Sequence, residues 1–120
     1  MVQINLTWQQ CEEGWCLLND LNLNEERFEL QAGVYIIWRQ LSSAREILRV
    51  GQGYLKQRLH LHRWEPDIMS IPKSELCVTW ATLDAAHRDG AERYLAEVLK
   101  PAMPLDPPLM VDRVIVSLPW

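Results

Sequence analysis

Residues 33–50 read GVYIIWRQLSSAREILRV, and this stretch decides how the chain folds. Residues 33–38 are rich in β-branched and aromatic side chains, which favour a strand. The serine-containing residues 40–44 predict a turn. Residues 46–50, EILRV, predict a second strand. The two strands are therefore expected to form a hairpin.

A helix is expected directly after this hairpin. Residues 51–53, GQG, are expected to end the second strand. Residues 54–64 place Leu55 and Leu59 one turn apart, which predicts a helix of about three turns. Residues 65–67, EPD, are expected to end that helix because proline disfavours the helical conformation in the residue before it.

The rest of the chain adds a strand and a second helix. Residues 75–82, ELCVTWAT, predict a strand, and residues 84–100 predict a helix that Pro101 ends. Shorter stretches at 2–8 and 111–118 predict edge strands. The resulting β-β-α-β-α order predicts an α+β fold with a small mixed three-stranded central sheet flanked by helices.

Composition excludes several classes of protein. The chain has 120 residues, 48% of them hydrophobic and 23% charged, which is typical of one folded domain rather than a disordered chain. Its formal net charge is −4, which argues against a protein that coats nucleic acid or membranes through bulk positive charge. Residues 39–64 nevertheless contain six basic residues and one acidic residue. This basic segment is either an anion-binding surface or simply a solvated helix face.

Targeting signals and cysteine pattern favour a cytoplasmic protein. No apolar run approaches the roughly 18 residues that a membrane helix needs. The N-terminal residues lack the basic and apolar regions of a secretory signal. Cys11, Cys16 and Cys77 form no dense framework, so reduced thiols are expected, and with His87 they show no standard zinc spacing.

Polar residues in unusual places suggest a site. Glu92 lies on or beside the apolar stripe of the last predicted helix, where a carboxylate needs a cation or hydrogen bonds, although it also suits the edge of the stripe or the helix dipole. Arg58 and His62 lie one turn apart and suit phosphate binding and proton transfer, or form an ordinary surface pair. Tyr35 is by itself an ordinary core aromatic.

Together these residues resemble the GIY-YIG endonuclease family. Gly33-Val34-Tyr35 stands for the first signature triplet and Arg49-Val50-Gly51 for the second. Arg58 followed by His62 resembles the family's helix, and Glu92 followed by Pro101 resembles its metal-binding glutamate helix. The resemblance covers about residues 31–104, leaving a lead-in of residues 1–30 and a tail of residues 105–120 within a single domain 1–120.

The sequence departs from the family pattern at two positions. Arg49 stands where the family usually has tyrosine, and Pro104 stands where it usually has asparagine. Thirteen residues separate Tyr35 from Arg49, slightly more than in the usual hairpin. These departures leave room for weakened or altered activity.

The resemblance implies a metal-dependent endonuclease acting on nucleic acid, with DNA the favoured partner and Mg²⁺ or Mn²⁺ the cofactor. It implies that Glu92 holds the cation and that Arg58 stabilises the phosphate. It also implies that Tyr35 acts as general base or proton relay for the attacking water, with a pKa lowered by nearby cations, and that His62 assists the proton transfer. Further phosphate contacts are expected from Arg49, Lys56 and Arg63, with Arg39 and Arg45 guiding the backbone. The alternatives are a catalytically weak or inactive module of this family that binds nucleic acid or protein, and an unrelated small α+β domain.

Overall fold

The α+β class is confirmed by a computed structural model, which describes residues 2–105 and 110–120. Part of the expected tail, residues 106–109, lies outside the described residues. The strands are β1 (Gln3–Ile4), β2 (Cys16–Leu17), β3 (Ala32–Gln40), β4 (Arg45–Tyr54), β5 (Leu76–Thr82) and β6 (Ile115–Val116). The helices are α1 (Leu55–Arg63), α2 (Pro66–Met69) and α3 (Ala85–Leu99), with 3-10 turns at Leu18–Asp20, Glu26–Phe28 and Lys73–Glu75.

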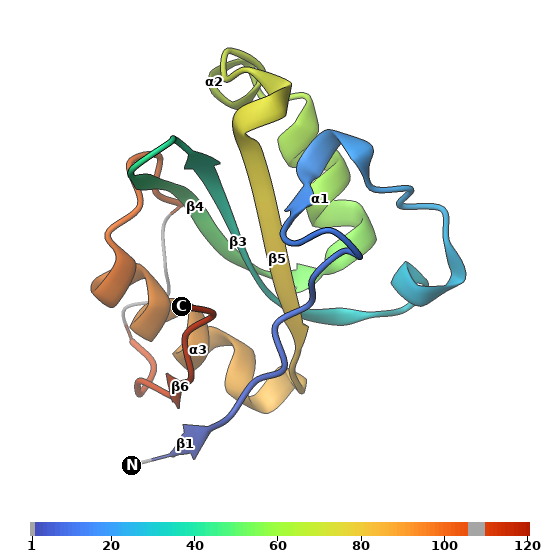
Figure 1. Cartoon of the computed structure of the whole chain (residues 1–120). Helices are drawn as coiled ribbons and strands as arrows, with labels where there is room; N and C mark the ends of the chain where they lie inside the picture. The colour runs from blue at the N-terminus through green and yellow to red at the C-terminus, as the bar shows by residue number, and fades with distance from the viewer. Residues whose placement is uncertain (1, 106–109) are drawn as a thin grey trace.

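The central sheet differs from the three-stranded mixed sheet that was expected. Four strands of the described chain form it, in the order β2-β5-β3-β4, and every neighbouring pair is antiparallel. The parallel pairing is confined to a separate two-stranded ladder of β1 and β6. The sheet gained its fourth strand because Cys16 and Leu17 pair with the outer edge of β5. At the opposite side of the sheet, β4 is the edge strand (Figure 1).

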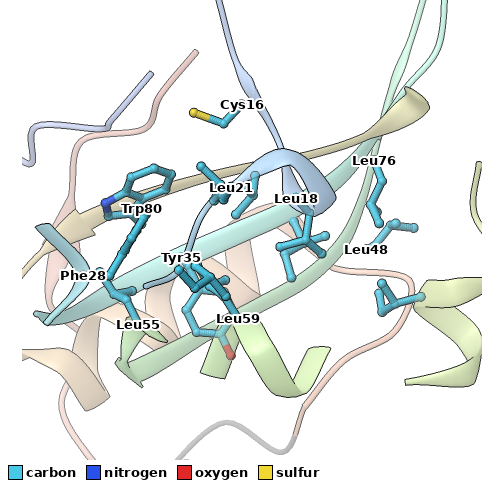
Figure 2. Packing of buried hydrophobic residues seen from close by; sticks show 14 residues of the cluster. Cys16, Leu18, Leu21, Phe28, Tyr35, Leu48, Leu55, Leu59, Leu76 and Trp80 are labelled. Atoms are coloured by element: carbon cyan, nitrogen blue, oxygen red, sulfur yellow. The ribbon is translucent and has the colours of Figure 1, made fainter. Parts of the chain in front are cut away.

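Alternation along the strands divides the core between the two faces of the sheet. Tyr35 and Ile37 point to the face covered by α1, where Leu55 and Leu59 complete a buried cluster (Figure 2). The intervening β3 residues face the other side, where α3 packs through Ala91 and Leu95. The two long helices therefore lie on opposite faces, and both contact β4.

The second strand is longer than expected because the glycines do not end it. β4 continues through Gly51 and Gly53 to Tyr54, in register with β3, so that Gly51 pairs with Tyr35. Gly53 has φ +135°, a conformation that side-chain-bearing residues rarely adopt. The extended strand brings β4 directly to the first residue of α1.

The cysteines also differ from expectation. Cys11 and Cys16 form a disulfide, whereas Cys77 is a buried free thiol. The expectation of three reduced thiols is therefore wrong for this pair. Within the part of the chain that the structure describes, no helix is both long enough and apolar enough to cross a membrane.

The glycine of the first triplet has a packing role in the sheet. A Cβ added at Gly33 would lie 1.9 Å from the backbone oxygen of Ala81 on β5. Because that neighbour is backbone, it has little freedom to move away. We expect Gly33→Ala to lower the free energy of unfolding by about 1–3 kcal/mol, measured by urea denaturation. Unchanged stability would contradict this close approach.

Candidate active site

Tyr35 lies at the centre of β3 with its side chain completely buried. Its ring covers Gly51 on the neighbouring strand, where an added Cβ would lie 2.2 Å from the tyrosine hydroxyl. Gly51 therefore provides the space in which the Tyr35 ring lies. Gly51 of the second triplet thus leaves the space that the Tyr35 ring of the first triplet occupies.

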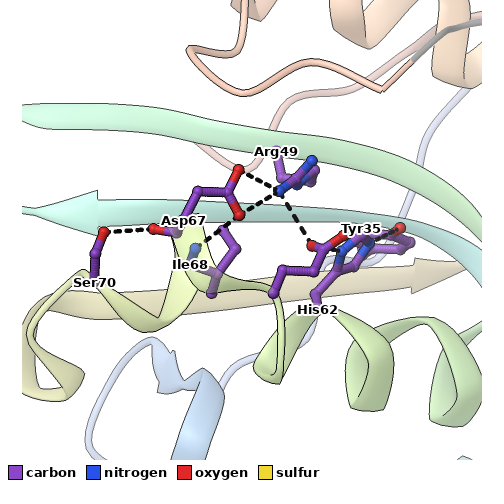
Figure 3. A network of polar contacts seen from close by, with 7 residues as sticks. Tyr35, Arg49, His62, Asp67, Ile68 and Ser70 are labelled. Carbon is purple, nitrogen blue, oxygen red and sulfur yellow. Dashed lines mark hydrogen bonds and ion pairs between the residues drawn. The ribbon is translucent and has the colours of Figure 1, made fainter.

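The Tyr35 hydroxyl has a hydrogen-bond partner on α1. Its oxygen lies 2.5 Å from Nε2 of His62, a side chain that is only 2% exposed. The other ring nitrogen, Nδ1, lies 2.5 Å from Oε1 of Glu65 (Figure 3). A phenol, an imidazole and a carboxylate are therefore connected in one line.

The resemblance implied a lowered pKa for Tyr35, but the pKa is raised instead. Burial raises it from the usual 10 to about 12, and this outweighs the positive charges of Arg58 and Arg49, which lower it. The phenol is consequently protonated at neutral pH. Burial likewise lowers the pKa of His62, more than the adjacent Glu65 carboxylate raises it. His62 is therefore neutral at pH 7 and able to accept a proton.

Arg58 extends from α1 toward the same hydroxyl. Its aliphatic stem lies over Gly53, where an added Cβ would be 3.2 Å from Cγ. The positive charge of the guanidinium lowers the pKa of Tyr35 and also that of Glu92. Its Nε is buried without a hydrogen-bond partner. An unsatisfied buried donor is costly, so this cation is suited to receive an anion.

Glu92 approaches from α3, on the other side of edge strand β4. Its side chain is buried, with 7% exposed, and its carboxylate forms no hydrogen bond or ion pair with the residues that the structure describes. Burial and the nearby Asp89 carboxylate raise its pKa from 4.5 to about 7, while Arg58 lowers it. Asp89 itself is tied to β4 through Gln52, at 2.9 Å. Glu92 is thus an acid held in place without a partner.

A divalent cation fits this carboxylate. Binding a cation would replace the missing partner of Glu92 and compensate its desolvation. Among residues 2–105 and 110–120, no group of three or more His, Cys, Asp and Glu side chains is placed to hold a metal. Mg²⁺ retains most of its waters and can be held by one or two carboxylates, so the expected cation at Glu92 stays a prediction.

Arg49 is engaged inside the protein. Its side chain is buried, and Nη2 lies 3.1 Å from Glu65 Oε1 and 3.2 Å from Asp67 Oδ2. Its Nε is buried without a hydrogen-bond partner, as in Arg58, but the two carboxylates already balance its charge, so Arg49 is less suited than Arg58 to receive a phosphate. Its expected phosphate contact stays a prediction.

Lys56 and Arg63 point away from Tyr35 and line a different hollow. Together with the segment preceding β3, they surround a cavity of about 850 Å³. Arg63 donates to the backbone oxygens of Leu18 and Leu21, so it holds the lead-in against α1. Of these two cations, Lys56 is exposed and has no partner among the described residues.

The remaining cations of the basic segment are also engaged. Arg39 forms an ion pair with Glu75 at 3.0 Å. The Arg45 guanidinium lies 4.2 Å from the centre of the Trp120 ring. Within this segment Arg39 and Arg49 therefore pair with carboxylates, which reduces but does not remove the attraction of the segment for a nucleic-acid backbone.

The roles of Glu65, Gly51 and Gly53 in the site were not predicted from the sequence. The signal for Glu65 was present, because it follows His62 by three residues, but the adjacent Pro66 made it look like a helix stop. Gly51 and Gly53 were likewise interpreted as strand breakers. The available signal was their spacing of two residues, which places both glycines on the same face of a strand, where the side chains of Tyr35 and Arg58 pack over them.

Comparisons with known proteins leave the family resemblance untested. A scan against family models found no match, and neither the curated proteins nor the solved structures gave a significant similarity. The residues themselves therefore carry the functional argument.

The raised pKa of Glu92 has a consequence for stability. Between about pH 4.5 and 7 the folded state keeps a proton that the unfolded state has released, so stability falls as pH rises through this window. Glu92→Gln removes this loss. In EDTA we expect the variant to match wild type at pH 4 and to exceed its free energy of unfolding by up to about 3 kcal/mol at pH 8. Urea denaturation at both pH values measures the difference.

Glu97 on the same helix is the matched control. It is exposed, and Arg113 and Arg93 lower its pKa. Its folded state therefore favours the ionised form, and Glu97→Gln should give no gain in stability at pH 8. A Glu92→Gln variant no more stable than wild type at pH 8 would contradict the buried, partnerless carboxylate.

Proposed function

We propose that this chain is a metal-dependent endonuclease that hydrolyses phosphodiester bonds in nucleic acid, with DNA as the primary substrate. One observation carries the proposal. The Tyr35 hydroxyl lies 2.5 Å from His62 while the Arg58 charge acts on both Tyr35 and the partnerless Glu92. An acid-base pair, a phosphate-binding cation and a candidate metal ligand are the groups that phosphodiester hydrolysis needs.

Each residue has a distinct role in this proposal. Tyr35 accepts a proton from the attacking water as its own proton passes to His62. Because the two transfers occur together, no free tyrosinate with a pKa near 12 has to accumulate. Arg58 stabilises the charge that develops on the phosphate. Glu92 would hold one Mg²⁺ or Mn²⁺, which supplies Lewis-acid charge to the phosphate and the leaving oxygen.

Access to the hydroxyl is a requirement of the proposal. Tyr35 is fully buried, so substrate binding must expose its hydroxyl. The same burial favours a second candidate, a module of this type that binds nucleic acid or protein without cutting it. Because the basic segment has few cations left unpaired and the chain carries a net charge of −4, we expect weak, salt-sensitive binding to duplex DNA in either case. A cytoplasmic location stays a prediction from the sequence.

Cleavage assays test the proposal directly. Labelled duplex, single-stranded and branched DNA, and matching RNA, are incubated with protein and Mg²⁺ or Mn²⁺. We expect cleavage by wild type and a loss on the order of 10²-fold in Glu92→Gln and Arg58→Ala. Since Glu92→Gln is expected to be at least as stable as wild type at pH 8, its loss of activity cannot come from unfolding.

Glu97→Gln and Arg113→Ala are matched controls. They alter an acidic and a basic residue that pair with each other outside the site, so they should leave cleavage unchanged. Cleavage that survives in both Glu92→Gln and Arg58→Ala would identify a contaminating nuclease. Binding with chelated metal, tolerant of Glu92→Gln and without cleavage under any condition, would support the binding module instead.

A further inference from the structure

Glu65 occupies a fixed position between two helices. It follows the end of α1, and Pro66 begins α2 immediately after it. Its backbone N–H donates to the His62 carbonyl at 3.2 Å. The backbone turn therefore returns the Glu65 side chain to the last turn of α1, where it meets His62.

The hydrogen bonds define the tautomer of His62. An ionised carboxylate accepts hydrogen bonds and cannot donate them, so the nitrogen facing Glu65, Nδ1, carries the ring proton. In a neutral ring Nε2 is then the acceptor, and it faces the Tyr35 hydroxyl. The phenol consequently donates to His62, and its own lone pairs remain free to accept a proton.

Arg49 holds Glu65 in turn. The same carboxylate oxygen, Oε1, contacts both His62 Nδ1 and Arg49 Nη2, at 2.5 and 3.1 Å. Asp67 contacts Arg49 from the other direction but makes no contact with His62. Arg49 thus fixes the carboxylate from a rigid strand, which explains a buried cation at a position where the resembled family usually has tyrosine.

We infer that Glu65, held by Arg49, is a positioning residue that orients His62 to receive the proton of Tyr35. This inference rests on the proposed function for its chemical purpose. In the attack step, water loses a proton to the Tyr35 oxygen, the Tyr35 proton moves to His62 Nε2, and a P–O bond forms to the water oxygen. The imidazolium is stabilised by Glu65. When the other P–O bond breaks, the proton returns through Tyr35 to the leaving oxygen or to solvent.

The charged groups around His62 support this assignment. Glu65 faces it from the start of α2 and raises its pKa, whereas Arg49 on β4 and Arg58 on α1 lower it. Tyr35 on β3 faces it with a neutral hydroxyl. Glu65 is therefore the group among these that favours the protonated ring.

NMR of the imidazole nitrogens tests the geometry without any nuclease assay. In wild type at pH 8 we expect the His62 proton on Nδ1, with Nε2 as an acceptor. Glu65→Gln keeps a hydrogen-bond acceptor but removes the charge, so it should lower the pKa of His62. Asp67→Asn is the matched control, because it also loses a carboxylate beside Arg49 but should leave that pKa unchanged.

Single-turnover cleavage adds the chemical readout. We expect Glu65→Gln to reduce the rate by on the order of 10²-fold and Asp67→Asn by less than about 3-fold. A wild-type proton on Nε2, or equal effects of the two variants on His62, would overturn the inference. A protein that shows the expected tautomer and pKa change but never cleaves would refute the proposed nuclease while retaining Glu65 as the residue that orients His62.

Discussion

The hydroxyl of Tyr35 is buried in the middle of the sheet, and its need for a hydrogen-bond partner constrains everything around it. Burial removes water from the phenol hydroxyl, and without a hydrogen-bond partner the free-energy cost of this desolvation would not be compensated. His62 supplies that partner only because β4 continues into α1 without a loop. Gly51 leaves room for the ring, and Glu65 fixes the second imidazole nitrogen. The hairpin, the helix and the helix end are therefore linked through one polar line (Figure 3).

Local patterns predicted the hairpin, α1, β5 and α3, because each has a strong apolar period. They failed where long-range contacts decide the outcome. The two-residue strand β2 depends on pairing with β5, and nothing in its own sequence requires that pairing. Gly51 and Gly53 looked like strand breakers, but their lack of side chains serves Tyr35 and Arg58. The residue types in the site were predictable, but their hydrogen-bond partners were not. The backbone turn at the C-terminal end of α1 decides where the Glu65 side chain points.

Long-range contacts also change the interpretation of the basic segment 39–64. The sequence places most of its surplus positive charge between residues 39 and 64, which suggests a surface for phosphate. In the fold, Arg39, Arg49 and Arg63 bind carboxylates or backbone oxygens of the protein. These side chains hold the sheet edge, α2 and the lead-in together. In the site, the Nε atoms of Arg58 and Arg49 are both buried without a hydrogen-bond partner, but Arg49 pairs with two carboxylates, so the attraction for an anion is greatest at Arg58.

Burial keeps the reacting groups close to neutral in the resting protein. Tyr35 is protonated, burial favours the uncharged form of His62, and burial raises the pKa of Glu92 to about 7, which favours its protonated form. Arg49 is balanced by Glu65 and Asp67, whereas Arg58 forms no ion pair within residues 2–105 and 110–120 and its charge reaches Glu92. An anionic phosphate is therefore favoured at this site, and a cation binding to Glu92 has to displace a proton.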